Sequence, residues 1–231
     1  MQGNTCQECG GRQTCLLLSR LAPQEIEATR GTRHIRTYQA RQILYHEGMP
    51  ALGIHHLCSG RVKLSRGDHN GRTQILRIVG PGEICGEEAL MQGVPYTNTA
   101  EALDTCQSAF MKREAFLDFL QNRDHVLLPL LQHICQVLID TQIRLTHMAL
   151  SDARTRLVAQ LLELADRYGQ SGSKGVTLQL ALRRGEVAAL VGLSPETVIR
   201  LLSQLQREGL VDVRGRHLTI KALERLRALL P

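Results

Sequence analysis

The chain has 231 residues, a net charge of +6 at pH 7, 43% hydrophobic residues and 22% charged residues. This composition is ordinary for a globular protein with one large domain or two smaller ones. The longest strongly apolar run, residues 126–131, is far too short to cross a bilayer, and the first residues lack the basic and apolar blocks of a secretory signal. We therefore expect a cytoplasmic protein with no membrane partner.

The charge is unevenly distributed along the chain. From Leu150 onward there are 13 Lys and Arg residues against 8 Asp and Glu residues, whereas the preceding part is nearly neutral. A basic C-terminal part favours contact with a polyanion, although a solvated basic face would have the same composition. The seven cysteines favour metal or redox chemistry, because a disulfide framework is unusual in a cytosolic chain.

Residues 32–111 are expected to form short strands. Short apolar runs alternate there with turns that contain glycine, and the predicted strands are residues 42–46, 54–57, 62–65, 75–79 and 106–111. Many short strands at regular spacing predict an antiparallel sandwich or jelly roll.

Two helices are expected next, over residues 112–120 and 124–150. Apolar side chains in the longer helix recur in steps of four and three, which is the spacing of a coiled-coil seam. This seam predicts a homodimer; the alternative is a helix that packs only against its own domain. The seam residues are Leu127, Leu131, Ile134, Leu138, Thr141, Leu145 and Met148.

The C-terminal part is expected to be a winged helix-turn-helix. A helix over residues 152–168 ends at Gly169, which occupies the place of a glycine C-cap, and a strand follows at 176–180. Two helices at 184–191 and 195–208 are separated by a glycine turn. Residues 211–213 and 217–220 then predict a two-stranded wing, followed by a helix at 221–229.

The second helix of this unit carries the candidate DNA contacts. Glu near a helix start accepts a hydrogen bond from cytosine, and Arg one turn later binds guanine or a phosphate. An ordinary surface helix with a Glu–Arg pair would have the same spacing, but the complete unit and its basic charge favour double-stranded DNA. The candidate DNA-binding residues are Ser194, Glu196, Thr197, Ile199 and Arg200.

Three cysteines stand close together at the N-terminus. Cys6, Cys9 and Cys15 form a C-x₂-C-x₅-C run. Three thiolates can converge on one soft metal centre, but a tetrahedral site or a cluster needs a fourth ligand from elsewhere.

The chain resembles the CRP/FNR family of bacterial transcription regulators over essentially its full length. Residues 192–202 (GLSPETVIRLL) are similar to the family's recognition helix, and residues 82–87 (GEICGE) resemble the signature of its effector-domain β-roll. The resemblance implies an α+β fold with an N-terminal arm and short helix (1–31), a cyclic-nucleotide-binding-like β-roll (32–111), helices that include a dimerisation helix (112–150), and a winged helix-turn-helix (151–231). It also implies palindromic promoter DNA, a homodimer and RNA polymerase as partners.

The resemblance distinguishes two kinds of sensor. Members that bind cyclic AMP carry an Arg after the GExxGE turn, whereas here residues 96–101 (YTNTAE) contain no cation. A buried phosphate without a paired charge is costly, so we expect no cyclic nucleotide, and Glu83 and Glu87 are then structural residues.

The FNR branch shares the N-terminal cysteine triad and one further cysteine near the end of the β-roll. It implies a [4Fe–4S] cluster held by Cys6, Cys9, Cys15 and Cys106, which senses oxygen, with nitric oxide as a secondary signal. Alternative fourth ligands are Cys58, Cys85 and Cys135. Alternative sensors are zinc, a thiol–disulfide switch, or haem that responds to CO or NO.

Two residues depart from the FNR pattern. Thr141 stands where FNR-type regulators carry an acidic residue on the dimer helix, so we expect a dimer that persists without the cluster. Ile199 replaces the Ser of their E-x-x-S-R recognition helix, which leaves the outer bases of the half-site open. The scattered histidines form no H-E-x-x-H motif, and we find no nucleophile motif or phosphate loop, so we do not expect an enzyme.

Overall fold

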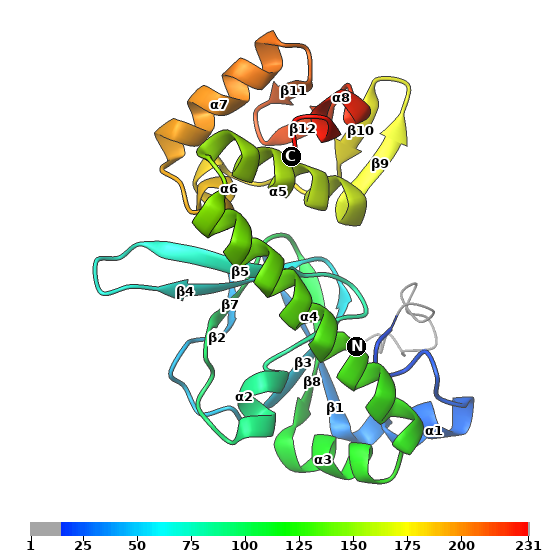
Figure 1. The fold of residues 1–231 in the computed structure, drawn as a ribbon. Helices are drawn as coiled ribbons and strands as arrows, with labels where there is room; N and C mark the ends of the chain where they lie inside the picture. Colours follow the sequence, from blue (N-terminus) through cyan, green and yellow to red (C-terminus); the bar gives the residue numbers. More distant parts are fainter. Residues whose placement is uncertain (1–14, 231) are drawn as a thin grey trace. The chain divides into compact units, whose positions relative to one another are not determined.

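The computed structural model describes residues 15–230. The chain divides into two compact units, Met1–Leu138 and Ile139–Pro231 (Figure 1). The predicted Cys6 and Cys9 ligands lie outside the described residues.

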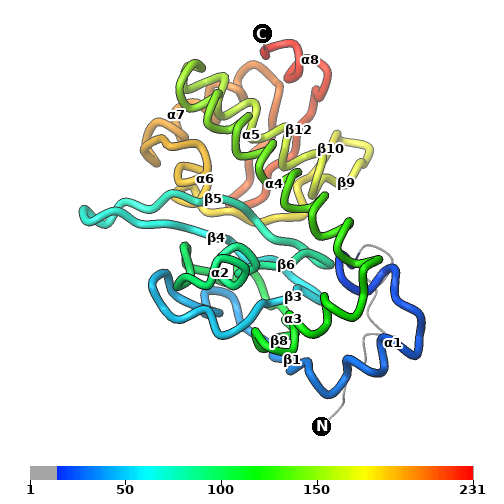
Figure 2. Tube along the Cα trace, turned by 60° about the horizontal axis from the view of Figure 1, so that its bottom comes forward, coloured from blue at the N-terminus to red at the C-terminus, as the bar shows by residue number. Residues whose placement is uncertain are grey.

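Two antiparallel four-stranded sheets form the body of the first unit. Their strand orders are β1-β8-β3-β6 and β2-β7-β4-β5. The α+β class with an antiparallel roll is thus confirmed, and the β4–β5 hairpin extends from the roll in both views (Figures 1 and 2). The strands are β1 (Arg33–Tyr38), β2 (Ile43–Tyr45), β3 (Gly53–Ser59), β4 (Val62–Gly67), β5 (Thr73–Val79), β6 (Ile84–Cys85), β7 (Thr99–Ala102) and β8 (Cys106–Lys112).

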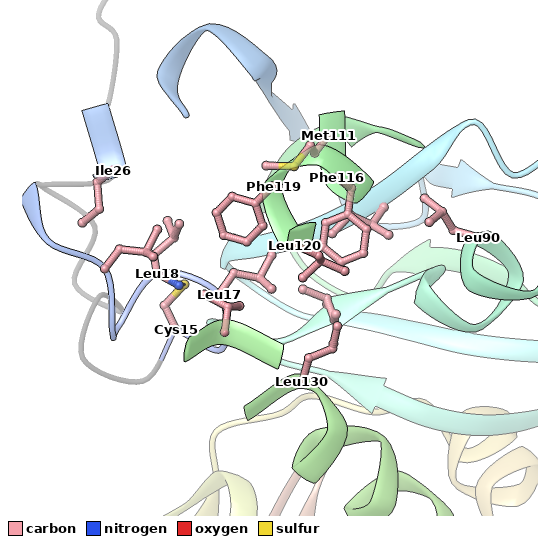
Figure 3. Packing of buried hydrophobic residues seen from close by; sticks show 14 residues of the cluster. Cys15, Leu17, Leu18, Ile26, Leu90, Met111, Phe116, Phe119, Leu120 and Leu130 are labelled. Atoms are coloured by element: carbon pink, nitrogen blue, oxygen red, sulfur yellow. The ribbon is translucent and has the colours of Figure 1, made fainter. Parts of the chain in front are cut away.

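The first unit has two hydrophobic clusters, one on each face of the β1-β8-β3-β6 sheet. The inner cluster contains residues from both sheets, such as Tyr45 of β2 and Leu57 of β3. The outer cluster joins Met111 of β8 to the helices that cover the other face (Figure 3), and it also contains Ile54 of β3. Successive side chains of a strand point to opposite faces, so β3, β6 and β8 each contribute to both clusters.

Helices and the N-terminal segment cover the outer face of that sheet. They are α1 (Pro23–Ala28), the 3₁₀ helix η2 (Arg30–Thr32), α2 (Glu87–Gln92), α3 (Arg113–Gln121) and the long helix α4 (Asp124–Leu150). The short helix α2 was not expected from the sequence. It begins after Gly86, whose φ of 87° is in the left-handed region that favours glycine.

The second unit contains α5 (Ala153–Tyr168), α6 (Arg184–Val191), α7 (Pro195–Arg207) and α8 (Leu223–Arg227). Its sheet has the order β11-β12-β10-β9, so the predicted two-stranded wing is part of a four-stranded sheet. The strands are β9 (Gly169–Gly172), β10 (Gly175–Leu178), β11 (Val211–Arg214) and β12 (His217–Ile220).

Gly169 does not cap α5 in the way expected. Its φ and ψ are −80° and 139°, which is extended backbone, and it begins β9. Glycine is required here for a different reason: a Cβ atom would lie 2.2 Å from the Ala165 carbonyl oxygen and 2.5 Å from Val176 Cγ1. Residues 169–172 form β9, which pairs with β10 as a hairpin.

Candidate functional site: a helix-turn-helix, an apolar helix and a buried Cys–His pair

The turn between α6 and α7 has the geometry of a helix-turn-helix. Gly192 takes a φ of 64°, and the Ser194 hydroxyl caps α7 by accepting a hydrogen bond from the Thr197 amide at 3.2 Å. Pro195 occupies the first helical position, where its lack of an amide hydrogen costs nothing because an amide there would have no acceptor within the helix. The helix start is thereby fixed by local chemistry.

One face of α7 is buried and the other is open. Val198, Leu201, Leu202 and Leu205 pack into the second unit, as the amphipathic pattern predicts. Glu196, Ile199 and Arg200 are exposed, and Ile199 retains 50% of its surface. The predicted DNA contacts therefore lie on the exposed face of α7, which could enter a major groove of DNA.

Glu196 is held as a carboxylate. Its own backbone amide and the Ser194 side chain both lower the pKa of this carboxyl. An ionised carboxylate is a pure acceptor, which suits a cytosine amino group and opposes a phosphate.

Two contacts fix the ends of the surface that carries the predicted DNA contacts. Arg184 at the start of α6 donates to the Gly215 carbonyl at the wing tip, at 2.6 Å. Arg154 of α5 forms two bonds with Glu208 at the end of α7, at 2.9 and 2.5 Å.

The long helix α4 exposes the predicted seam. Leu127, Leu131 and Leu138 retain 42%, 57% and 56% of their surface, and only Val126 and Leu130 are buried in the helix. The other seam residues, Ile134, Thr141 and Leu145, are also exposed, while Met148 is half-buried. By length and composition alone, α4 is long and apolar enough to cross a membrane.

Cys15 is buried in the first unit. It is 2% exposed and belongs to the outer hydrophobic cluster (Figure 3). Its Sγ atom is 3.0 Å from Nε2 of His56 on β3 and accepts a hydrogen bond from the Leu18 amide at 3.2 Å. Burial, with a smaller contribution from Arg33, lowers the pKa of His56 to about 4, so the imidazole is neutral at pH 7.

Cys106, the predicted fourth ligand, lies in the inner cluster, between the two sheets. Burial, and to a lesser degree Asp104, raises the pKa of its thiol to about 11. The structure thus brings Cys15 to His56 and does not bring it to Cys106. Among residues 15–230 there is no group of three or more potential metal ligands.

The remaining cysteines have varied surroundings. Cys85 is fully buried in the inner cluster, where burial and then Glu87 raise the pKa of its thiol. Cys58 is half-buried on β3, and Cys135 on α4 is exposed.

No sequence motif predicted the ion-pair cluster that joins β5, α2 and α4. Arg77 of β5 lies 3.2 Å from Glu87 of α2, and its Nη1 atom lies 3.2 Å from Nε2 of His133 on α4. Burial would raise the pKa of Glu87, but the hydrogen bond with His133 and the charge of Arg77 lower it. Glu87 is therefore held as a carboxylate by a buried ion pair within the first unit.

Comparison with known proteins decides the family. A model of the cyclic nucleotide-binding domain matches residues 35–123, and a model of the Crp-like helix-turn-helix domain matches residues 155–229. A CRP-like cAMP-activated global transcriptional regulator of Mycobacterium tuberculosis is 30% identical over 183 residues, which is 79% of this chain and 82% of that protein. The chain belongs to the CRP/FNR family.

Two further relatives show the range of this CRP/FNR family. Regulatory protein HlyX of Actinobacillus pleuropneumoniae is 26% identical over 229 residues and spans 96% of this chain and 92% of its own. The structure of FixK2 from Bradyrhizobium japonicum superposes with a TM-score of 0.77 at 24% identity, covering 86% of this chain and 98% of FixK2. The CRP/FNR regulators bind DNA as dimers, and the Mycobacterium tuberculosis relative is a transcriptional regulator.

Proposed function

We propose that this protein is a cytoplasmic, dimeric DNA-binding transcription regulator in which an oxygen-labile [4Fe–4S] cluster at the N-terminal cysteines controls promoter binding and anaerobic gene expression. The observation that carries the proposal is the burial of Cys15 beside His56, in the cluster that also holds the base of α4. A thiolate and a neutral imidazole are suitable donors for a soft metal.

The protein's own residues connect this site to the dimer helix. Figure 3 shows Leu17 and Leu18, which follow Cys15, in one cluster with Leu130 of α4. The cluster also contains Val126, so α4 contributes Val126 and Leu130. Those two are the only buried residues of α4. If Cys15 is released from the cluster, the neighbouring Leu17 and Leu18 no longer pack firmly against the start of α4. A dimer interface with two stable arrangements responds to such small shifts.

The exposed seam of α4 is proposed to pair with a second copy of the chain. Two copies related by a two-fold axis present two α7 helices to successive major grooves, which predicts a palindromic promoter site. RNA polymerase is a further proposed partner, through the surface of the roll.

The Mycobacterium tuberculosis relative is named as cAMP-activated, so cyclic nucleotide binding is the second candidate. The position of Glu88 argues against cyclic nucleotide binding, because this carboxylate accepts hydrogen bonds from Thr97 and Asn98 at 3.0 and 2.7 Å. These residues follow the GExxGE turn where the nucleotide-binding members place a cation. A cyclic phosphate would meet a negative charge and no counter-charge, so calorimetric titration with cAMP should give no heat of binding.

The nature of the sensor is tested by purification without oxygen. We expect a broad absorption shoulder near about 400 nm that air bleaches, with iron and acid-labile sulfide in the protein. A sharp Soret band would indicate haem instead, and a colourless protein would indicate zinc or a thiol–disulfide switch.

The DNA-reading role is tested with Glu196→Ala. The variant should lose discrimination at one base pair of the half-site, by about 1–3 kcal/mol, in a competition assay with single-base variants of the site. Gln206→Ala, an exposed position of the same helix, serves as the control. Equal weakening on every sequence would assign Glu196 to helix stability and not to base recognition.

A further inference from the structure

We propose that the second unit binds a small carboxylate with an apolar body in a cavity between α4, α5 and α6. The cavity has a volume of about 360 Å³. Small-molecule sites of this size combine an apolar lining with a few polar groups that orient the ligand. All the lining residues belong to the second unit, so the proposal does not depend on a metal centre at the N-terminal cysteines.

The apolar part of the lining comes from all three helices. Leu190 and Val191 at the end of α6 are 1% and 3% exposed, so they lie at the closed end of the cavity. Ala159 of α5 and Met148 of α4 are half-buried, and Ile143 of α4 is exposed. A hydrocarbon or aromatic body that displaces water from these side chains would be stabilised by the burial of apolar surface.

Three arginines line the same cavity, and two of them share one acid. Arg144 Nη2 lies 3.3 Å from Oε1 of Glu163, and Arg167 Nη1 lies 3.9 Å from the same oxygen. The buried Gln160 donates to the other carboxylate oxygen of Glu163 at 2.9 Å. Protein donors therefore occupy both oxygens of Glu163, which leaves this carboxylate little capacity to bind a cationic ligand.

Arg156 is the third of these arginines, and it has no acid beside it. Its Nη1 atom donates to the Met148 carbonyl at 3.2 Å, and its Nε atom is buried without a hydrogen-bond partner. In the part of the chain that the structure describes, Arg156 forms no ion pair. Of the other acids in the lining, Asp166 lies 3.2 Å from Arg227, and Asp140 is exposed.

The charge of Arg156 determines the kind of ligand. A partly buried guanidinium without a counter-charge is costly, and one anionic group in the cavity would supply that charge. A carboxylate carries a single charge and matches the fork of a guanidinium, whereas a phosphate monoester would bring up to two charges against one unpaired cation.

The cavity also borders the helix-turn-helix. Val191 is the last residue of α6, and the turn to α7 begins at Gly192. A ligand that contacts both Val191 and Arg156 would connect the end of α6 to α5. The site is therefore in direct contact with the DNA-binding unit.

Calorimetric titration of the full-length protein tests the ligand class with three probes of equal chain length. Octanoate carries an anionic end, octanol a neutral end and octylammonium a cationic end. We expect octanoate to bind at least about tenfold more tightly than octanol, because its hydrogen bonds to arginine are charge-assisted, and octylammonium to give no binding. Equal affinity for all three would show that only apolar surface is involved and would overturn the proposal.

Two variants and a matched control test the site. Arg156→Met should weaken octanoate binding by about tenfold or more and leave octanol binding unchanged. Ala159→Leu should abolish octanoate binding by filling the cavity. Arg154→Met removes the same charge from the same helix outside the cavity, where Arg154 pairs with Glu208, and should bind octanoate like the wild type. Circular dichroism and thermal unfolding check that each variant is folded. Wild-type affinity in Arg156→Met, or binding retained by Ala159→Leu, would refute the site.

Methyl NMR locates the bound octanoate. Met148 lines the cavity, whereas Met49 and Met91 are exposed on the first unit. In protein with ¹³C-labelled methionine methyl groups, octanoate should shift the Met148 signal and leave the other two unchanged. Comparable shifts at Met49 or Met91 would assign the binding to apolar surface of the first unit and overturn the proposal. The metal-free protein should bind octanoate as the metal-containing protein does, so failure here leaves the proposed function untouched.

Discussion

The buried ion pair between Arg77 and Glu87 gives a quantitative prediction for Glu87→Gln. Glu87 is 4% exposed, and the change leaves the Arg77 guanidinium buried without its counter-charge. Removing one partner of a buried pair costs about 3–5 kcal/mol. Arg77 keeps its hydrogen bond to the Ile84 carbonyl at 3.0 Å, so we expect the lower end, about 3 kcal/mol. This corresponds to a decrease of roughly 6–12 °C in the Tm of the first unit.

Differential scanning calorimetry measures this decrease, because it can separate the transitions of two units. Glu88→Gln is the control, since Glu88 is the adjacent residue of α2 and bonds to neutral partners, Thr97 and Asn98. The double replacement Arg77→Met with Glu87→Met should recover most of the loss, because apolar residues of similar volume often substitute for a buried pair. A decrease in Tm no larger than that of Glu88→Gln would show that the pair contributes little.

The same carboxylate makes stability depend on pH. The pKa of Glu87 is lower in the folded protein than in the unfolded chain, so its stabilisation is present above the unfolded pKa of about 4.3 and is lost as the pH falls through the folded pKa. Acid titration of the free energy of unfolding should therefore be shallower in Glu87→Gln than in the wild type. Parallel titration curves would contradict the lowered pKa.

Three further predictions concern the dimer helix and the DNA-binding unit. Leu131→Glu should give monomers in sedimentation, whereas Leu128→Glu, exposed but off the seam, should remain dimeric; equal effects would refute the seam. Because Thr141 carries no charge, the metal-free protein should sediment as a dimer at micromolar concentration, and clean monomers would contradict this. Ser194→Ala should cost about 1 kcal/mol of stability in the second unit through loss of the α7 cap, measured by urea unfolding.

The helices of the DNA-binding unit could be predicted because their signals are local. The cap at Ser194, the proline after it and the spacing of apolar residues in α7 are all read within one stretch of sequence. The orientation of Cys106 could not be predicted in this way, since it depends on the register between β3 and β8. The resemblance to the FNR branch suggested Cys106 as the fourth ligand, whereas the alternation of side chains along the strand turns its thiol to the inner face.

Other features arise only when distant segments meet. Arg77, Glu87 and His133 come from a strand and two helices, and none of them carries a sequence motif that predicts the others. Gly169 had a local interpretation as a helix cap, but close approach to Ala165 and Val176 decided its role. The adjacent histidines on β3, in an otherwise apolar strand, were the one visible sign of a polar site there.

The cluster shared by the N-terminal segment and α4 has a consequence for hydrogen exchange. The Leu16 amide donates to the Gly82 carbonyl at 2.8 Å, and the Val126 amide donates to the Arg123 carbonyl at 2.9 Å. The side chains of this segment and of the first turns of α4 pack on one another, so exposing either set to water opens the other. Both amides should therefore exchange with the same opening free energy, as members of one cooperative unit that includes the roll's outer face.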